Sequence, residues 1–272
     1  MRFVLPGLIC CLSTLAAAQL KLPSLSSEAK VVQTAGLTTI TVDYSSPAVK
    51  GRKIFGGLVP LDKVWRAGAN HSTVVTFSQP VVVGGKDVAA GTYGFLAIPG
   101  ATSWTLILSS QVDLWGSDGY KPEHDVARVT PQPIANRERL VYLVTNFDNA
   151  AANIDLEWEK VRVTLPVKLK TAEQAVAAIK ALDAQGPQYT QAARYYLEEK
   201  DYANTVVYAD KALAAQETWL ALWVKAQGLA GQKKFKEALP LAEKAQTLGQ
   251  QNPERFFFAA DVKKALTDWK GK

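Results

Sequence analysis

Hydrophobic and polar residues alternate over short runs in the first part of the chain. The clearest run extends from Thr38 to Tyr44, in which Ile40, Val42 and Tyr44 share one face. Successive side chains of an extended strand point to opposite sides, so an alternating run has one face in the core and one in solvent. The run therefore predicts a half-buried β-strand, and Gly36 just before it predicts a hairpin turn.

Further runs of β-branched and aromatic residues follow at intervals of about ten residues, with Gly, Pro or Asn between them. They cover residues 72–78, 81–83, 91–98, 104–108, 126–129, 140–147, 154–158 and 161–167. The last two are expected to pair as a hairpin, with Asp155 and Glu157 on its solvent face. No helical period interrupts the runs, which argues against a parallel sheet. The pattern predicts an antiparallel β-sandwich, or an open barrel, over residues 29–168.

The pattern changes to a helical period at Thr171. Within the helical part, Ala193 recurs as Ala226 and Ala209 recurs as Ala242, with the same offset each time. Helix-turn-helix units at about this spacing resemble tetratricopeptide repeats. The sequence therefore predicts an all-α helical-repeat domain over residues 171–272, in which the first and last helices cap the repeats.

The first eighteen residues have the parts of a secretory signal. Arg2 is followed by an apolar run and by three small residues that end at Ala18. We therefore expect residues 1–18 to be a cleaved signal peptide, with an uncleaved anchor as the alternative, and residues 19–28 to be a linker. No later run of about 20 apolar residues predicts a transmembrane segment. The expected location is the periplasm, or the outside, of a Gram-negative bacterium.

The cysteines and histidines limit the chemistry that the chain can perform. Cys10 and Cys11 both lie in the signal, and the rest of the chain has only His71 and His124. Because structural zinc sites are built from Cys and His, no metal site is predicted. No cofactor is predicted either. The net charge of +6 is mild and dispersed, so nucleic acid is not an expected partner.

One stretch between two predicted strands, residues 49–70, gathers cations, an indole and flexible glycines. Lys53 and Arg66 could hold a carboxylate or phosphate, Arg through its planar two-point fork. Trp65 lies next to Arg66, and Asn70 could orient a polar ligand. The connection is longer than the fold requires, which favours a site. The alternative is structural, with Trp65 closing the end of the sandwich and Arg66 stacked on it or paired with a buried acid.

A second candidate is the Gly-rich loop around Trp115. Asp118, together with Asp113 and Glu123, places carboxylates beside an indole on which a sugar could stack. The loop could therefore bind an envelope glycan. An alternative function is a cell-envelope glycan hydrolase that uses acids near Trp115, since glycosidases use a pair of carboxylates. An enzyme is less favoured, because no nucleophile motif or phosphate-binding loop occurs.

Together these features favour an exported binding or scaffold protein. The β domain would hold a small anion or a sugar, and the helical repeats would hold a protein or peptide partner. The candidate partner contacts in the helical part are Tyr195, Tyr208, Trp219 and Trp223. The remaining alternative is a purely structural envelope protein.

Four segments resemble an exported bacterial family that is known only as domain of unknown function 2911. They are VDYSSPAVKGRKIFGGLVPLDKVWRAGAN at 42–70, GTYGFLAIPG at 91–100, Trp115-Gly116, and LEWEKVRVTLPV at 156–167. The resemblance covers about residues 24–167 and implies export, the end of the β domain and a helical tail. It implies no activity and no catalytic residue.

Overall fold

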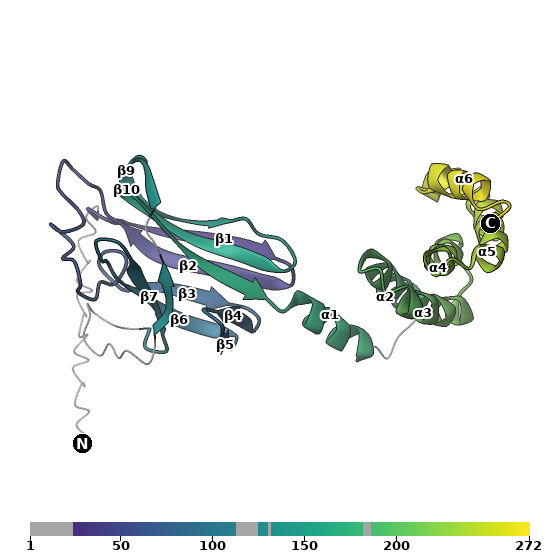
Figure 1. The fold of residues 1–272 in the computed structure, drawn as a ribbon, viewed down its shortest axis with the longest axis horizontal. Coiled ribbons are helices and arrows are strands. Elements are labelled where there is room, and N and C mark those ends of the chain that lie inside the picture. The colour runs from purple at the N-terminus through teal and green to yellow at the C-terminus, as the bar shows by residue number, and fades with distance from the viewer. Residues whose placement is uncertain (1–23, 113–124, 130–131, 182–185) are drawn as a thin grey trace, which may run out of the picture. The chain divides into compact units, whose positions relative to one another are not determined.

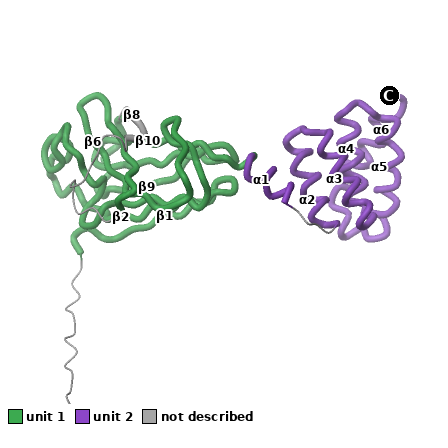
Figure 2. Tube along the Cα trace, turned by 90° about the horizontal axis from the view of Figure 1, so that it is seen from below, with its two compact units in different colours: residues 1–172 green, residues 173–272 purple. Residues whose placement is uncertain are grey.

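The computed structural model describes residues 24–112, 125–129, 132–181 and 186–272 (Figure 1). The chain divides into two compact units, residues 1–172 and 173–272 (Figure 2). Strands make up the first unit and helices the second. The predicted fold class, an antiparallel β domain followed by an all-α domain, is confirmed. The expected signal peptide at 1–18 lies outside the described residues.

Two antiparallel sheets form the β unit. The first has the order β1 (Ser27–Ala35), β2 (Thr38–Ser46), β3 (Thr73–Phe77), β6 (Gly91–Ile98), β7 (Trp104–Ser109) and β8 (Asp125–Val129). The second has the order β5 (Lys86–Val88), β4 (Val81–Val83), β10 (Ala151–Leu169) and β9 (Gln132–Thr145). Most strands coincide with predicted runs, because alternation directly records which side chains face the core. β9, however, begins at Gln132 instead of at 140, and β5 lies in no predicted run.

The hairpin of β1 and β2 shows the expected geometry. Ala35 pairs with Thr38 across a turn in which Gly36 has a φ of 52°, a backbone conformation that favours glycine. Ile40 and Val42 are fully buried, as the alternation predicts.

β10 doubles back on itself, which confirms the hairpin expected over its two halves. Glu159 has a φ of 52°, and the amide of Leu169 donates to the carbonyl of Ala150 over 2.7 Å. The side chains of Arg162 and Glu157 also meet. In each contact, one residue precedes residues 159–160 by as many positions as the other follows them. The turn of the hairpin therefore lies at residues 159–160. The returning half reaches β4 through Val167 and its neighbours.

The core lies between the two sheets. Its largest fully buried side chains in this unit include Trp104, Trp158, Tyr142, Phe77 and Phe95. No described residue of the unit is a cysteine. Burial of these aromatic and aliphatic side chains is therefore the main source of stability.

The helical unit consists of short helices. They are α1 (Thr171–Lys180), α2 (Gly186–Glu198), α3 (Tyr202–Ala215), α4 (Trp219–Gly231), α5 (Phe235–Gly249), a 3₁₀ turn (Pro253–Arg255) and α6 (Ala259–Asp268). The sequence pattern predicts that Gly186-Pro187 ends a helix. The pair instead begins α2, where a proline in the first turn loses no helical hydrogen bond.

The helices repeat with the spacing found in the sequence. α4 starts as far along the chain from α2 as α5 does from α3. Lys200 and Lys233, which have the same separation, both have a positive φ, at 60° and 62°, just after α2 and α4. Ala209 and Ala242 are both fully buried. The small side chains let neighbouring helices approach closely, so the repeat is structural as well as sequential.

Candidate functional site

The connection between β2 and β3, residues 47–72, is hereafter called the crossover. It is fixed to both sheets. Ala48 forms an isolated antiparallel bridge with Arg139 of β9. Farther along, Trp65 pairs with Ala97 of β6 through two backbone hydrogen bonds of 2.7 and 2.8 Å. Because β2 and β3 are antiparallel neighbours in the first sheet, the connection begins and ends on that sheet and contacts the second sheet at β9 on the way. Its shape is set by paired backbone rather than by a free loop.

The backbone of the crossover is unusually strained. Lys50, Asp62, Ala67 and Asn70 all have positive φ values, between 49° and 57°. For a residue with a Cβ this conformation costs on the order of 1 kcal/mol or more, and it persists only where the surroundings enforce it. Such residues concentrate at binding sites, so the strain marks the crossover as a candidate site.

A tight loop over residues 54–59 forms the outer part of the crossover. The amides of Gly56, Gly57 and Val59 donate to the carbonyls of Val59, Ile54 and Ile54 over 2.9, 3.2 and 2.9 Å. A Cβ at Gly57 would collide with the carbonyl oxygen of Lys53, so this position requires glycine. Ile54 is fully buried and anchors the loop in the core.

Four aromatic rings meet beneath this loop. Trp65 stacks on Trp158 of β10 at 6.0 Å between ring centres, with the planes 21° apart. Phe55 packs edge-on against Trp104 at 4.8 Å. The indole N–H of Trp65 donates to the carbonyl of Gly68 over 3.1 Å, which fixes the ring. The ring of Trp65 therefore packs against the core at this end of the sandwich.

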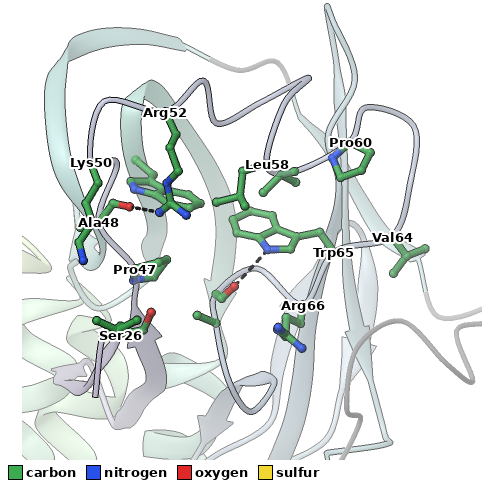
Figure 3. Close-up of a pocket in the computed structure, with 15 residues that line it drawn as sticks. Ser26, Pro47, Ala48, Lys50, Arg52, Leu58, Pro60, Val64, Trp65 and Arg66 are labelled. Carbon is green, nitrogen blue, oxygen red and sulfur yellow. Dashed lines mark hydrogen bonds between the residues drawn. The ribbon is translucent and has the colours of Figure 1, made fainter. Parts of the chain in front are cut away.

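A cavity of about 430 Å³ opens beside these rings. Trp65 and Trp158 form part of its wall, and Leu58, Pro60 and Val64 supply further apolar surface (Figure 3). Its volume lies within the range of small-molecule sites, about 300–1,000 Å³. The indole N–H of Trp158 is buried and has no hydrogen-bond partner within the described part of the chain. Since buried indole N–H groups usually have an acceptor, this leaves an unused donor in the wall.

Three cations line the same cavity, namely Lys50, Arg52 and Arg66, and Figure 3 shows Arg66 apart from the other two. None of the described lining residues carries a carboxylate. The guanidinium of Arg52 is held by the carbonyls of Val49 and Ala48, at 3.0 and 2.5 Å. Two of its five N–H groups are used in this way, so its remaining donors have a fixed position.

Only some of the crossover residues that the sequence suggests as ligand contacts line the cavity. Trp65 and Arg66 line the cavity, whereas Lys53 and Asn70 do not. The side-chain amide of Asn70 donates to the Ser26 carbonyl and to the Ser45 hydroxyl, at 3.1 and 3.2 Å. It ties the crossover to the start of β1.

Sequence patterns do not identify every lining residue. Trp158 belongs to β10, far along the chain from the crossover, and its place in an alternating run indicates only a core residue. Lys50 and Arg52 belong to the cationic stretch, but nothing in the sequence distinguishes them from Lys53. Several candidates of the second loop lie outside the described residues, namely Trp115, Asp118, Asp113, Glu123 and His124.

Asp155 and Glu157 require a correction. They point away from the core, as predicted, but they are only 2% and 1% exposed instead of solvated. Asp155 accepts from the hydroxyls of Thr145 and Thr164, at 2.7 and 2.5 Å. Cross-strand neighbours of the hairpin therefore cover both carboxylates.

Glu157 lies between two arginines. Its carboxylate oxygens meet the Nη2 of Arg137 at 2.5 Å and the Nε of Arg162 at 2.6 Å. Both arginines are partly exposed, so they cover the carboxylate and neutralise its charge. This arrangement is a structural ion-pair cluster, and it does not contribute to the cavity lining.

Tyr142 supports the crossover from below. Its hydroxyl is buried and donates to the carbonyl of Ala67 over 2.8 Å, and the Thr73 hydroxyl donates to the same carbonyl over 3.1 Å. Two donors thus hold the strained Ala67. We expect Tyr142→Phe to lower the free energy of unfolding of the β unit by about 1 kcal/mol, because one buried hydrogen bond is lost. Urea denaturation of the full chain near neutral pH measures this.

The same substitution should change the pH dependence of stability. Burial holds the pKa of the Tyr142 phenol well above its usual range; a hydrogen bond with Thr73 acts in the opposite direction, and Tyr44 adds to the rise. The unfolded phenol ionises at about pH 10, so its contribution is complete below that pH and is lost as the pH rises toward the higher pKa of the folded state. The stability difference between wild type and Tyr142→Phe should shrink from about pH 9 to 11. A constant difference would contradict this assignment.

The candidate partner residues of the helical unit lie in two groups. Tyr208 stacks on Tyr196 at 5.3 Å, and the ammonium of Lys211 lies 4.7 Å from its ring centre. Tyr195 packs edge-on against Tyr196. Tyr195 and Tyr208 are half-buried, so part of each side chain remains accessible on α2 and α3.

Trp219 and Trp223 are more deeply packed. Trp219 meets Phe256 edge-on at 5.0 Å, and Trp223 is buried against Trp269 at 5.8 Å. Trp223 also lines a second cavity of about 190 Å³. Its other lining residues include Arg194, Glu198, Gln227 and Phe258. The helices thus bring two aromatic groups together, one around Tyr208 and one around Trp223.

Comparison with known proteins places the β unit in a family. Residues 26–167 match the model of a family described as "Protein of unknown function (DUF2911)", and this span exceeds half of the chain. The chain belongs to this family. The matched span includes the whole crossover and both sheets except the last two residues of β10. No curated protein and no solved structure matched the chain.

Metal clusters and membrane spans are both missing from the part of the chain that the structure describes. Within the described ranges, no three His, Cys, Asp or Glu side chains gather where they could hold a metal ion. Among the described helices, none has both the length and the apolar character needed to cross a bilayer.

Proposed function

We propose that the DUF2911 domain binds a small organic anion with an apolar body in the cavity beside the crossover. The observation that carries this proposal is the lining, in which three cations face a site with no carboxylate among its described residues. A lining of this charge attracts a carboxylate or phosphate, and the fixed guanidinium of Arg52 offers directed donors. The apolar wall favours a ligand whose remaining surface is hydrophobic.

The backbone supports this proposal independently. The crossover keeps strained residues such as Lys50 and Ala67 in place through bonds to both sheets. A site held in this way loses little conformational entropy when a ligand binds. Lys50 is an example of a lining residue with a fixed backbone. Its amide donates a hydrogen bond of 2.9 Å to the Glu138 carboxylate.

A thermal-shift series with the full chain tests the proposal. Aromatic and aliphatic carboxylates and phosphates should raise the midpoint of unfolding, whereas neutral amides of the same shape should not. Lys50→Gln should weaken the binding of an active anion by about tenfold, since a hydrogen bond to a charged group contributes about 1.5–3 kcal/mol. Calorimetric titration measures the affinity.

Lys168→Gln is the matched control. Lys168 is an exposed lysine of β10 that does not line the cavity, so its loss should leave the affinity unchanged. If no anion of the series binds, or if both variants lose affinity equally, the cavity is not the anion site. Neutral sugars and calcium belong in the same screen, because binding of a sugar would favour a glycan ligand instead.

Export of the protein is part of this proposal. Its basis is the signal-like sequence of residues 1–18, which would bring the domain to where envelope glycans and small anions occur. Two alternatives remain. A glycan hydrolase would use the acids near Trp115, and a structural envelope protein would use neither cavity.

A second candidate function is binding of a protein or peptide by the helical unit, which we infer to be a tetratricopeptide-like array. The supporting observations are the constant spacing of the helix pairs and the cavity beside Trp223. Arg194 and Glu198 would supply charge at its rim, and Phe258 apolar surface. Arrays of helix pairs commonly hold extended peptides on such surfaces.

A further inference from the structure

Exposed leucines lie at the mouth of the cavity and on the adjoining tight loop. Leu25 is 77% exposed and Leu58 is 49% exposed, yet both line the cavity, so both lie at its opening. Leu61 is 36% exposed and lies beside Gly56 at the tip of the tight loop. Single exposed leucines are common on proteins, but a group of them around one opening indicates an interaction surface.

The same region is locally cationic. Residues 49–70 contain five cations and one carboxylate, a net charge of +4. The ammonium of Lys53 lies beside Gly56, as Leu61 does, so a cation and an apolar side chain flank the tip of the loop. The surface is therefore cationic and apolar together.

The backbone amides of the tight loop are hydrogen-bonded within the protein, as burial in an apolar environment requires. The four consecutive amides from Gly56 to Val59 all donate to carbonyls within the crossover. Backbone groups that lack a partner are costly in an apolar environment, whereas paired ones are tolerated. These four amides therefore keep their hydrogen bonds when the loop leaves water.

We propose that this end of the DUF2911 domain docks on an anionic lipid surface. Leu25, Leu58 and Leu61 enter the boundary between headgroups and acyl chains, and the surrounding cations meet the headgroup phosphates. Peripheral membrane binding requires this combination of apolar insertion and positive charge. An acidic protein partner would match the charge, but it would not explain three leucines that extend into solvent beside a loop with paired amides.

The proposal goes beyond the binding of a small anion, because it concerns the rim of the cavity rather than its interior. Lys53 and Lys63 are exposed and do not line the cavity. Substitutions at these two lysines therefore test the lipid surface while the cavity lining stays intact.

Sedimentation with vesicles tests the proposal on the full chain. Vesicles of phosphatidylcholine with about 30 mol% phosphatidylglycerol should bind the protein, pure phosphatidylcholine should not, and salt of about 0.5 M should weaken binding. Lys53→Gln/Lys63→Gln should weaken binding about fivefold for each lysine removed. Leu58→Ser/Leu61→Ser should weaken it at least about fivefold, because apolar contact with the acyl chains is lost.

Two controls match these variants. Leu37→Ser removes an equally exposed leucine, at 51%, from the turn between β1 and β2, and Lys168→Gln removes a lysine from β10. Both should bind vesicles as the wild type does. Absence of binding to the anionic vesicles overturns the proposal. So does unchanged binding of the Leu58→Ser/Leu61→Ser variant, which would show adsorption by charge alone. Far-ultraviolet circular dichroism checks that each variant is folded.

Discussion

Trp158→Ala should lower the free energy of unfolding of the β unit by about 3–5 kcal/mol. Trp158 is only 1% exposed, and it stacks on Trp65 beneath the crossover. Its removal leaves a large cavity that the two sheets cannot close by moving together. Trp65 also loses the ring on which it stacks. Hydrogen exchange of the full chain, followed peptide by peptide under native conditions, measures the loss in the β unit separately from the helical unit.

The matched control is Trp269→Ala. Trp269 stacks on Trp223 with nearly the same geometry, at 22° between the planes, but in the helical unit. Its loss should raise exchange in the helices and leave the strands protected. A loss of less than about 1 kcal/mol for Trp158→Ala would contradict the view that stacked indoles hold this end of the sandwich.

Arg162→Ala should destabilise the β unit by about 3 kcal/mol, because Glu157 would keep its buried charge with one partner fewer. We place the effect at the lower end of the range for broken buried ion pairs, since Arg137 remains and water reaches both arginines. Adding Glu157→Ala to Arg162→Ala should recover part of the loss. Urea denaturation of the two single variants and the double variant gives the coupling energy.

An exposed ion pair provides the comparison. Lys264 and Asp268 meet four residues apart on α6, with both side chains in solvent. The neighbouring lysine lowers the pKa of Asp268, chiefly through their hydrogen bond. Lys264→Ala should nevertheless leave stability unchanged within error, because water screens such pairs. Strictly additive effects of Arg162→Ala and Glu157→Ala would show that the buried pair is not coupled.

The sequence predicts most of the fold because alternation and helical period are local properties. Ile40 and Val42 show their burial through their spacing alone, and the helical repeat appears as alanines that recur at a constant offset. The burial of Glu157 is different. It depends on Arg162 across the hairpin and on Arg137 of another strand, and no spacing rule identifies both partners.

Only some residues of the candidate site come from one continuous stretch of the sequence. The crossover carries its cations and Trp65 in one stretch, so the sequence identifies the region. Which cation faces inward depends on the strained backbone: Lys50 and Arg52 line the cavity, whereas Lys53 does not. Trp158 arrives from a distant strand, and its place in the wall follows only from how the two sheets pack.

The bridge between the crossover and β9 also determines when the cavity can form. Beside this bridge, the hydroxyl of Ser46, the last residue of β2, donates to the carbonyl of Leu140, a contact between residues 94 positions apart in the chain. Contacts of such long range raise contact order and form slowly during folding. The crossover emerges early in synthesis, yet its cavity must await β9 and β10. A chain threaded through a membrane in the unfolded state would therefore acquire this cavity only near the end of folding.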